Sequence, residues 1–451
     1  MEKYDVIFIG SGHACWHGAL TLTLAGKKVA MVDRDVLGGT CTNYGCDAKI
    51  LLDSPFEYVD GLQNYEPLGI TSAPAVDWSR LMAYKKEQIG VMPMAMAGLF
   101  QRFGIPVLQG QGKLVDAHTV RVGETDYAAD YIVIGTGARP AVRDIPGKEY
   151  LHDSREFLDV DVFPDRLVIL GTGIIAMEFA SIALKLKKEV TILAHGDKAL
   201  REYPQKYVQR LIADMEREGA RFCWNQDVSE VVQNGESYTV KTAKGLAVDC
   251  DYILNATGRV ANVEGLGLEE LGIQASAKGI VVDDHLRTTL PNIYASGDVV
   301  DKRIPKLTPT AAFESDYIAA QILGMDTDPI RYPAIPNLVF TLPRISQTGV
   351  GVDEAEKHPD RYRVVSVPYG QMMLWNARNE ADLDITFVFD KADNHLAGAA
   401  VYGSDAGSWI DVLTIIINQK LGAAELGKMI FAFPTPTYGL ISTLLTQFNA
   451  R

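Results

Sequence analysis

The N-terminal segment Tyr4-Asp-Val-Ile-Phe-Ile-Gly-Ser-Gly12 is a short apolar run that ends in a Gly-x-Gly turn. A helix-like segment follows it to Leu24, and a second apolar run covers Lys28–Asp33. This order predicts a strand, a helix and a second strand, which together form a βαβ unit. In such a unit the first glycine, Gly10, makes the tight turn, and the second, Gly12, lets the backbone approach a pyrophosphate at the helix N-terminus.

The same pattern recurs in the middle of the chain. Arg166–Leu170 is an apolar run, Gly171-Thr-Gly173 is a second turn, and a helix-like segment leads to a further apolar run at Glu189–Leu193. Two more segments match one another, because Asp130–Gly137 and Asp251–Gly258 are each an apolar run that ends in Thr-Gly. The duplication therefore predicts two doubly wound α/β domains of the nucleotide-binding (Rossmann-like) type.

The residue that ends the second strand differs between the two copies. Asp33 lies 21 residues after the second glycine of its turn, where a carboxylate can accept both hydroxyls of an adenosine ribose, so this copy suits FAD. The same offset in the second copy falls on Ala194, which is followed by His195, with Lys198 and Arg201 close behind. With no carboxylate at that offset to repel a 2′-phosphate, the second copy favours NADPH over NADH. The alternative interpretation is that these cations belong to a solvated loop.

Length and composition exclude several classes of protein. The chain has 451 residues, 47% of them hydrophobic and 22% charged, which predicts a globular protein of about three domains. The formal net charge of −14 repels polyanions, so nucleic acid is not expected as a partner. The charged N-terminus lacks the pattern of a secretion signal, and the apolar stretch Ile89–Phe100 contains Pro93 and is shorter than the about 20 residues of a membrane span. We therefore expect a cytoplasmic protein without a membrane partner.

The most specific motif is Gly38-Gly-Thr-Cys41-Thr-Asn-Tyr-Gly-Cys46-Asp-Ala-Lys49, directly after the first βαβ unit. The chain contains only five cysteines, which argues against a framework of structural disulfides and makes this close pair a candidate for catalysis or metal binding. A Cys-x4-Cys pair that opens a helix holds two sulfurs close enough to form a strained disulfide. The helix N-terminus then stabilises the thiolate that forms on reduction.

With this motif the chain resembles the class I pyridine nucleotide-disulphide oxidoreductases, the family of dihydrolipoamide dehydrogenase, glutathione reductase and mercuric reductase. The resemblance extends over nearly the whole length, since Gly171-x-Gly173 with Glu178, Thr257-Gly258-Arg259 and Ile293–Asp298 follow in the family's order. It implies a homodimeric flavoenzyme with a C-terminal α+β dimerisation domain. The implied FAD-binding domain covers residues 1–148 and 264–331, the NAD(P)H-binding domain 149–263, and the dimerisation domain 332–451.

The resemblance also assigns roles to residues. Cys46 would lie against the flavin, Cys41 would be the outer sulfur that meets the substrate, and Lys49 would pair with Glu178 beside the flavin ring. The expected FAD-binding residues are Gly10, Gly12, Asp33, Thr40, Thr136, Gly137 and Asp298. The expected NADPH-binding residues are Gly171, Gly173, His195, Arg201 and Gly258. No metal site is expected, because in His13-x-Cys15-x-His17 the cysteine points about 200° away from His13 on a helix.

Two departures from the family pattern lie beside the cysteines. Ala48 stands where the family usually has Pro, and Asp47 places a carboxylate next to Cys46, which raises the pKa of a thiol.

A larger departure lies near the C-terminus. The family has a His-Pro-Thr segment there, with a Glu four residues after the Pro, and the partner subunit supplies it as the acid/base group. In this chain Phe433 replaces the His and Tyr438 replaces the Glu, and none of the eight histidines lies in the final segment. Cleavage of an ordinary disulfide expels a basic thiolate that needs a proton, so an efficient reductase of ordinary disulfides is disfavoured.

A substrate that expels a weakly basic leaving group needs this His less. Hypothiocyanous acid, which ends as thiocyanate, is the favoured electron acceptor, as in the family's oxidant-defence branch, and a soft metal ion is another possibility. Mercury is the weaker choice, because the last residues contain no cysteine pair. Three alternatives stay open: a reductase of low-molecular-weight disulfides, a flavin NAD(P)H oxidase or quinone reductase with idle cysteines, and a non-enzymatic FAD redox sensor.

Overall fold

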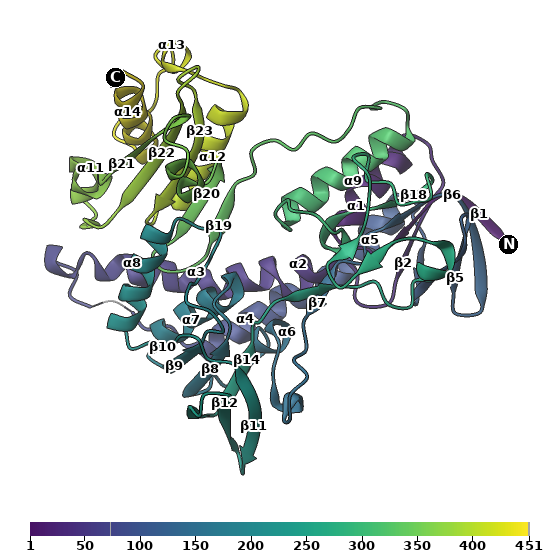
Figure 1. Ribbon diagram of the computed structural model, residues 1–451, viewed down its shortest axis with the longest axis horizontal. Helices are drawn as coiled ribbons and strands as arrows, with labels where there is room; N and C mark the ends of the chain where they lie inside the picture. The colour runs from purple at the N-terminus through teal and green to yellow at the C-terminus, as the bar shows by residue number, and fades with distance from the viewer. Residues whose placement is uncertain (73, 450–451) are drawn as a thin grey trace.

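The computed structural model describes residues 1–72 and 74–449, which form three sheet-centred units (Figure 1). The first βαβ unit is present as predicted, with β1 (Glu2–Ile9), α1 (His13–Leu24) and β2 (Val29–Asp33), and β1 and β2 are parallel. The inner residues of both strands are buried, because helices pack on one face of the sheet, and strands and loops of the same unit pack on the other. Burial on both faces makes continuous apolar runs favourable there.

The first sheet has the strand order β3-β2-β1-β6-β5-β4, with β18 added beside β6. Its other strands are β3 (Val107–Gln109), β4 (Gly112–Asp116), β5 (Thr119–Val122), β6 (Thr125–Ile134) and β18 (Ile293–Ala295). Helices α5 (Met92–Arg102) and α9 (Thr308–Ile322) pack with α1 on this sheet. Helix α2 (Gly39–Tyr44) follows β2, and α3 (Cys46–Gln63) and α4 (Trp78–Gly90) pack in the core of the second unit. α9 packs tightly on α1, where a Cβ at Gly18 would come within 2.4 Å of the Ser315 carbonyl oxygen.

The second βαβ unit is also confirmed, with β8 (Arg166–Leu170), α7 (Ile174–Lys185) and β9 (Glu189–Leu193). The parallel order β10-β9-β8-β14 repeats the order β3-β2-β1-β6 of the first sheet, so the duplication seen in the sequence is a duplication of topology. The other elements of this unit are α6 (Ser154–Phe157), α8 (Gln205–Arg217), β10 (Arg221–Cys223), β11 (Val228–Asn234), β12 (Ser237–Thr242), β13 (Ala247–Cys250) and β14 (Tyr252–Asn255).

The remaining elements are short two-stranded pairings and 3-10 helices. β7 (Ala138–Pro140) pairs with β15 (Arg259–Ala261), and β16 (Ala275–Ser276) pairs with β17 (Gly279–Ile280). Five short 3-10 helices in the described residues are η1 (Glu66–Leu68), η2 (Lys148–Tyr150), η3 (Glu269–Leu271), η4 (Gly297–Val299) and η5 (Tyr369–Gln371).

The C-terminal unit is an antiparallel sheet of order β19-β20-β23-β22-β21 with helices packed against it (Figure 1). Its strands are β19 (Asn337–Val339), β20 (Ile345–Gly349), β21 (Tyr362–Val367), β22 (Asp384–Asp390) and β23 (Leu396–Tyr402). Its helices are α10 (Val352–Glu356), α11 (Met373–Asn376), α12 (Ala406–Asn418), α13 (Ala423–Leu426) and α14 (Pro436–Asn449). Trp375 and Trp409 pack edge to face in its core. Among the described residues, no helix is both long and apolar enough to span a membrane.

Candidate active site

The two cysteines of the Cys-x4-Cys motif lie on consecutive helices. Cys41 is in α2, and Cys46 is the first residue of α3, as the motif predicts. Gly45 separates the helices, and a Cβ there would lie 2.7 Å from the Thr40 carbonyl oxygen and 3.0 Å from the Cys41 Cα. Only glycine lets the chain turn this tightly, so Gly45 brings the two thiols together.

The surroundings of the two thiols shift their pKa values in opposite directions. Interaction with the Cys41 thiol lowers the pKa of Cys46, and the Thr308 hydroxyl, 3.5 Å from the Cys46 Sγ, and the Lys49 charge act in the same direction against burial. The pKa of Cys41 is raised by the same interaction with Cys46 and by burial. The N-terminus of the 18-residue helix α3 also favours a thiolate at Cys46. These surroundings make Cys46 the more acidic of the two thiols.

A buried ion pair lies one turn further along α3. The Lys49 Nζ lies 2.9 and 3.0 Å from the two carboxylate oxygens of Glu178 on α7. The Phe340 backbone N–H donates to the same carboxylate at 2.9 Å, and the Phe340 ring lies under the Lys49 Nζ at 4.0 Å. The ion pair has the partners that the resemblance implies, and its role beside the flavin stays a prediction.

The sequence did not predict that Arg344, in the C-terminal unit, contacts α3 and the Phe340 ring beside this ion pair. Arg344 donates to Asp53 at 2.5 Å and to Glu57 at 2.8 Å, and its guanidinium lies 4.8 Å from the centre of the Phe340 ring. These contacts join α3 to the segment after β19. No local sequence pattern predicts these contacts, because the partners are almost 300 residues apart in the chain.

The predicted FAD-binding residues of the first unit form a backbone cradle. Gly10 has φ +121°, and a Cβ there would lie 2.5 Å from the Gly135 carbonyl oxygen. A Cβ at Gly39 would lie 2.8 Å from the Cα of Gly12, so side chains would fill the space between these loops. The Ser11 hydroxyl donates to Asp33 at 2.5 Å at the end of β2, and Thr40 is exposed beside them. Glycine loops, a helix N-terminus and a carboxylate at the strand end fit the adenosine and pyrophosphate of FAD.

The other predicted FAD-binding residues lie at the ends of neighbouring strands of the first sheet. The Thr136 hydroxyl donates to the Asn262 carbonyl oxygen at 2.7 Å, which ties this strand end to the segment after β15. A Cβ at Gly137 would meet no described atom within 4 Å. Asp298 lies in η4 directly after β18, and its backbone carbonyl accepts from the Lys306 Nζ at 2.8 Å. All three residues lie at the edge where ligands bind in open parallel sheets.

All five predicted NADPH-binding residues line one cavity of about 740 Å³ at the end of the second sheet. They are Gly171, Gly173, His195, Arg201 and Gly258. A Cβ at Gly173 or at Gly258 would meet no described atom within 4 Å, because both glycines face open space. The cavity lies over the N-terminus of α7, which suits the pyrophosphate of a dinucleotide.

A carboxylate that the offset from Gly173 does not reveal lies beside His195. Asp227, from the segment between β10 and β11, accepts a hydrogen bond from the His195 ring and lies 3.9 Å from the Arg143 guanidinium. Ala194 is fully buried, so its side chain does not form the cavity wall. Lys198, Arg201 and Arg143 nevertheless line the wall, so cations outnumber carboxylates there.

The residues that replace the family's acid/base pair lie far from Cys41 of the same chain. Phe433 is 71% exposed and Tyr438 is 39% exposed, and their rings pack edge to face with centroids 5.0 Å apart. Phe433 lies just before α14 and Tyr438 lies in its first turn. Helix α14 belongs to the C-terminal unit and is well separated from α2 (Figure 1). Within one chain, this aromatic pair is an exposed apolar surface.

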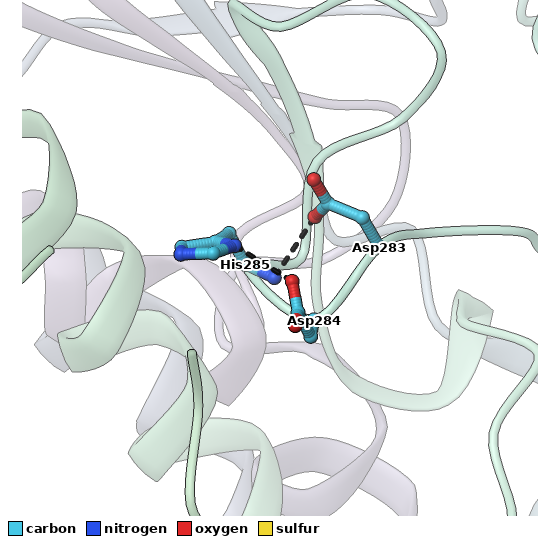
Figure 2. Close-up of side chains that lie close together, drawn as sticks. All are labelled: Asp283, Asp284 and His285. Atoms are coloured by element: carbon cyan, nitrogen blue, oxygen red, sulfur yellow. Dashed lines mark hydrogen bonds and ion pairs between the residues drawn. The ribbon is translucent and has the colours of Figure 1, made fainter. Parts of the chain in front are cut away.

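A further cluster, Asp283, Asp284 and His285, resembles a metal site in composition (Figure 2). Its groups are already engaged, because the His285 ring contacts Asp284 at 2.7 Å and the Thr327 carbonyl oxygen at 3.2 Å. The Asp283 carboxylate accepts from the backbone N–H groups of His285 and Arg287. These contacts are those of a turn, and we assign no ligand to it.

Comparisons with known proteins agree with this geometry. Residues 4–315 match the pyridine nucleotide-disulphide oxidoreductase family, and residues 335–439 match its dimerisation domain. A glutathione reductase of Burkholderia cepacia is 30% identical over 460 residues, covering 100% of both chains. A mercuric reductase of Staphylococcus aureus is 28% identical over 98% of this chain and 82% of its own.

A solved structure is similar over the same length. The Cu(II) complex of the HOCl-induced flavoprotein disulfide reductase RclA from Escherichia coli has a TM-score of 0.88 and 25% identity, covering 99% of this chain and 100% of its own. The relatives are enzymes of a family that uses FAD and NAD(P)H. The redox cysteine motif, the two nucleotide-binding sheets and the matching dimerisation domain together show that the chain belongs to the class I pyridine nucleotide-disulphide oxidoreductases.

Proposed function

We propose that this enzyme passes electrons from NADPH through FAD and the Cys41–Cys46 pair to a small electrophilic oxidant, with hypothiocyanous acid as the favoured acceptor. When bound, FAD would supply the two-electron chemistry that links the nicotinamide to the disulfide. The proposed FAD-binding domain covers residues 1–148 and 264–331, the NADPH-binding domain 149–263, and the dimerisation domain 332–451.

Individual residues of the chain have distinct roles in this proposal. Cys46 holds the thiolate on the flavin side, and Cys41 attacks the oxidant. Lys49 and Glu178 form a fixed ion pair 2.9 Å apart that orients the Lys49 ammonium beside the flavin. In the second unit Arg201 and Lys198 would bind the 2′-phosphate of NADPH, and Arg143 would balance Asp227.

The observation that carries the choice of acceptor is the aromatic pair Phe433 and Tyr438. In a homodimer, which the matching dimerisation domain supports, this exposed pair would face the partner's Cys41 where the family places a His and a Glu. Neither aromatic side chain replaces an imidazole as proton donor, since a phenylalanine has no proton to give and tyrosine has a pKa near 10. An oxidant that leaves as thiocyanate places the least demand on the missing group.

A specific observation favours a metal ion as the second candidate acceptor. The RclA structure with 25% identity holds Cu(II), and two close thiols are soft ligands that suit copper. In this proposal the metal ion is a substrate that the reduced enzyme reduces. A cytoplasmic location is part of the proposal, because a pair that must return to the dithiol state suits a reducing compartment.

Restoring the family's acid/base pair tests the proposal. We expect Phe433→His with Tyr438→Glu to raise the reduction of glutathione disulfide about 10²- to 10⁴-fold, the usual contribution of general acid catalysis. The rate with hypothiocyanous acid should stay nearly unchanged, because its final leaving group is a weak base. An equal change with both oxidants would contradict the proposal.

A further inference from the structure

A carboxylate in the middle of α9 is fully buried. The Glu314 side chain is 0% exposed, and glutamates are almost never buried to this extent unless they are paired. Among the residues described, its partners are the Lys302 ammonium, the Tyr332 hydroxyl and the Gly297 backbone N–H. The proposed electron path does not involve this carboxylate, so the burial of a charge here needs another reason.

The two oxygens of the Glu314 carboxylate have separate partners. Oε2 accepts from the Gly297 N–H at 2.7 Å, and Oε1 accepts from the Tyr332 hydroxyl at 2.6 Å and from the Lys302 ammonium. The Lys302 side chain is 8% exposed, so the two charges form a buried ion pair. Separation of such a pair leaves an uncompensated charge inside the protein, which is costly, so the carboxylate has little freedom to move.

Gly297 is the first residue of η4 and directly precedes Asp298, the expected FAD contact. Its φ of +75° favours glycine, and a Cβ there would lie 2.6 Å from the Ala14 Cβ in the first turn of α1. The Ser296 hydroxyl donates to the Ala14 carbonyl oxygen at 2.7 Å. The turn at 296–298 is therefore held against α1 on one side and, through Glu314, against α9 on the other.

The network also reaches the segments on either side of α9. Lys302 lies between η4 and α9, and Tyr332 lies in the segment that leads from α9 to β19. Helix α9 begins at Thr308, whose hydroxyl is 3.5 Å from the Cys46 Sγ. One helix therefore contacts a redox cysteine at its start and, less than about two turns later, carries the carboxylate that holds the turn before Asp298.

We infer that Glu314 is a positioning residue for FAD, which fixes the Gly297–Asp298 turn in the conformation that meets the cofactor. Lys302 and Tyr332 hold the Glu314 carboxylate in place for this task. The turn cannot open without stranding a buried charge, so Asp298 loses little conformational freedom when FAD binds. The inference needs the FAD that the family uses and goes beyond the choice of oxidant.

The rate of FAD release from the oxidised holoenzyme, followed by the fluorescence of the free cofactor, measures this role. We expect Glu314→Gln to release FAD at least about 10-fold faster, because the turn loses a charged acceptor, and Tyr332→Phe about 5-fold faster, because one hydrogen bond to that acceptor is lost. Tyr317→Phe, also on α9, is the matched control. Its hydroxyl likewise makes a 2.6 Å hydrogen bond, but to the Asp328 carbonyl oxygen, so this variant should release FAD like the wild type.

A double-mutant cycle separates positioning from a general loss of stability. Asp298→Asn weakens the expected FAD contact itself and should also speed release. If Tyr332 acts through the turn, Tyr332→Phe should change the release rate of Asp298→Asn by less than about 2-fold, because the contact that it supports is already weakened. A merely structural role would give the same factor of about 5 in both backgrounds, since independent effects add in free energy.

The outcomes decide the inference without an oxidant substrate, so they do not depend on the proposed acceptor. Wild-type release rates in both Glu314→Gln and Tyr332→Phe would overturn it. Equal acceleration by Tyr332→Phe and Tyr317→Phe, or full additivity with Asp298→Asn, would overturn it as well, because either result indicates a general loosening of α9. If Glu314→Gln does not fold, Tyr332→Phe with its control and the cycle give the answer.

Discussion

Removing the charge of Lys49 tests how deeply its ion pair with Glu178 is buried. The Glu178 side chain is 4% exposed and that of Lys49 is 18% exposed, with their charged atoms 2.9 Å apart. In Lys49→Met the Glu178 carboxylate keeps one donor, the Phe340 backbone N–H at 2.9 Å, and loses its only counter-charge among the described residues. Methionine preserves the length and apolar character of the side chain, so the change isolates the charge.

The size of the effect follows from burial. Breaking a buried ion pair by removing one partner costs about 3–5 kcal/mol, because the remaining charge is left uncompensated. Lys49 is partly exposed and the Phe340 N–H stays in place, so we expect the lower end, about 3 kcal/mol. Exposed pairs contribute about 0–1 kcal/mol. Lys86, whose pair with Asp161 is exposed on both sides, therefore offers a matched control as Lys86→Met.

Urea unfolding of the FAD-loaded protein, followed by tryptophan fluorescence, measures both variants. Lys49→Met should unfold at a clearly lower urea concentration than Lys86→Met. Adding Glu178→Gln to Lys49→Met should recover part of the loss, because the uncompensated charge is then removed. If Lys49→Met is no less stable than Lys86→Met, the ion pair is not buried in solution and its proposed role beside the flavin loses its basis.

Other predictions test the cofactor sites and the thiolate. Arg201→Leu should lower kcat/KM for NADPH about 10- to 150-fold, the worth of one charged hydrogen bond, and leave kcat/KM for NADH nearly unchanged; equal losses would remove Arg201 from the 2′-phosphate site. Cys46→Ser should abolish the long-wavelength absorbance of a thiolate against oxidised flavin, whereas persistence of the band would assign it to Cys41. Because the pKa of Cys46 is lowered, this band in the wild type should persist as the pH falls below the usual thiol value of about 8.5 and vanish only on further acidification. A band that vanishes near pH 8.5 would contradict the lowered pKa.

The sequence predicts those features that depend on local patterns. Apolar runs, paired glycines and the cysteine spacing lie within short stretches, so β1–α1–β2, β8–α7–β9 and the start of α3 at Cys46 could be read directly. The partners Lys49 and Glu178 followed from the resemblance to the family. The position of Gly45, which allows the two thiols to approach, also lies within the quoted motif.

Contacts between distant segments could not be predicted in this way. Asp227 pairs with His195 across 32 residues, and Phe340 reaches Glu178 across 162 residues, so neither pairing leaves a local periodic signal. The offset from Gly173 places Ala194 at the predicted 2′-phosphate site, but the Ala194 side chain is buried in the core directly after β9. Strand registers and side-chain directions decide such positions, and a count of residues does not supply them.

We propose that the missing acid/base histidine directs the enzyme to a small oxidant. Steady-state kcat/KM with saturating NADPH, measured for hypothiocyanous acid and for glutathione disulfide, tests it most directly. We predict that kcat/KM for hypothiocyanous acid is at least about 10²-fold higher, in line with the loss of general acid catalysis, and that Cys41→Ser abolishes turnover of both. Comparable values for the two oxidants, or turnover that survives Cys41→Ser, would contradict this proposal.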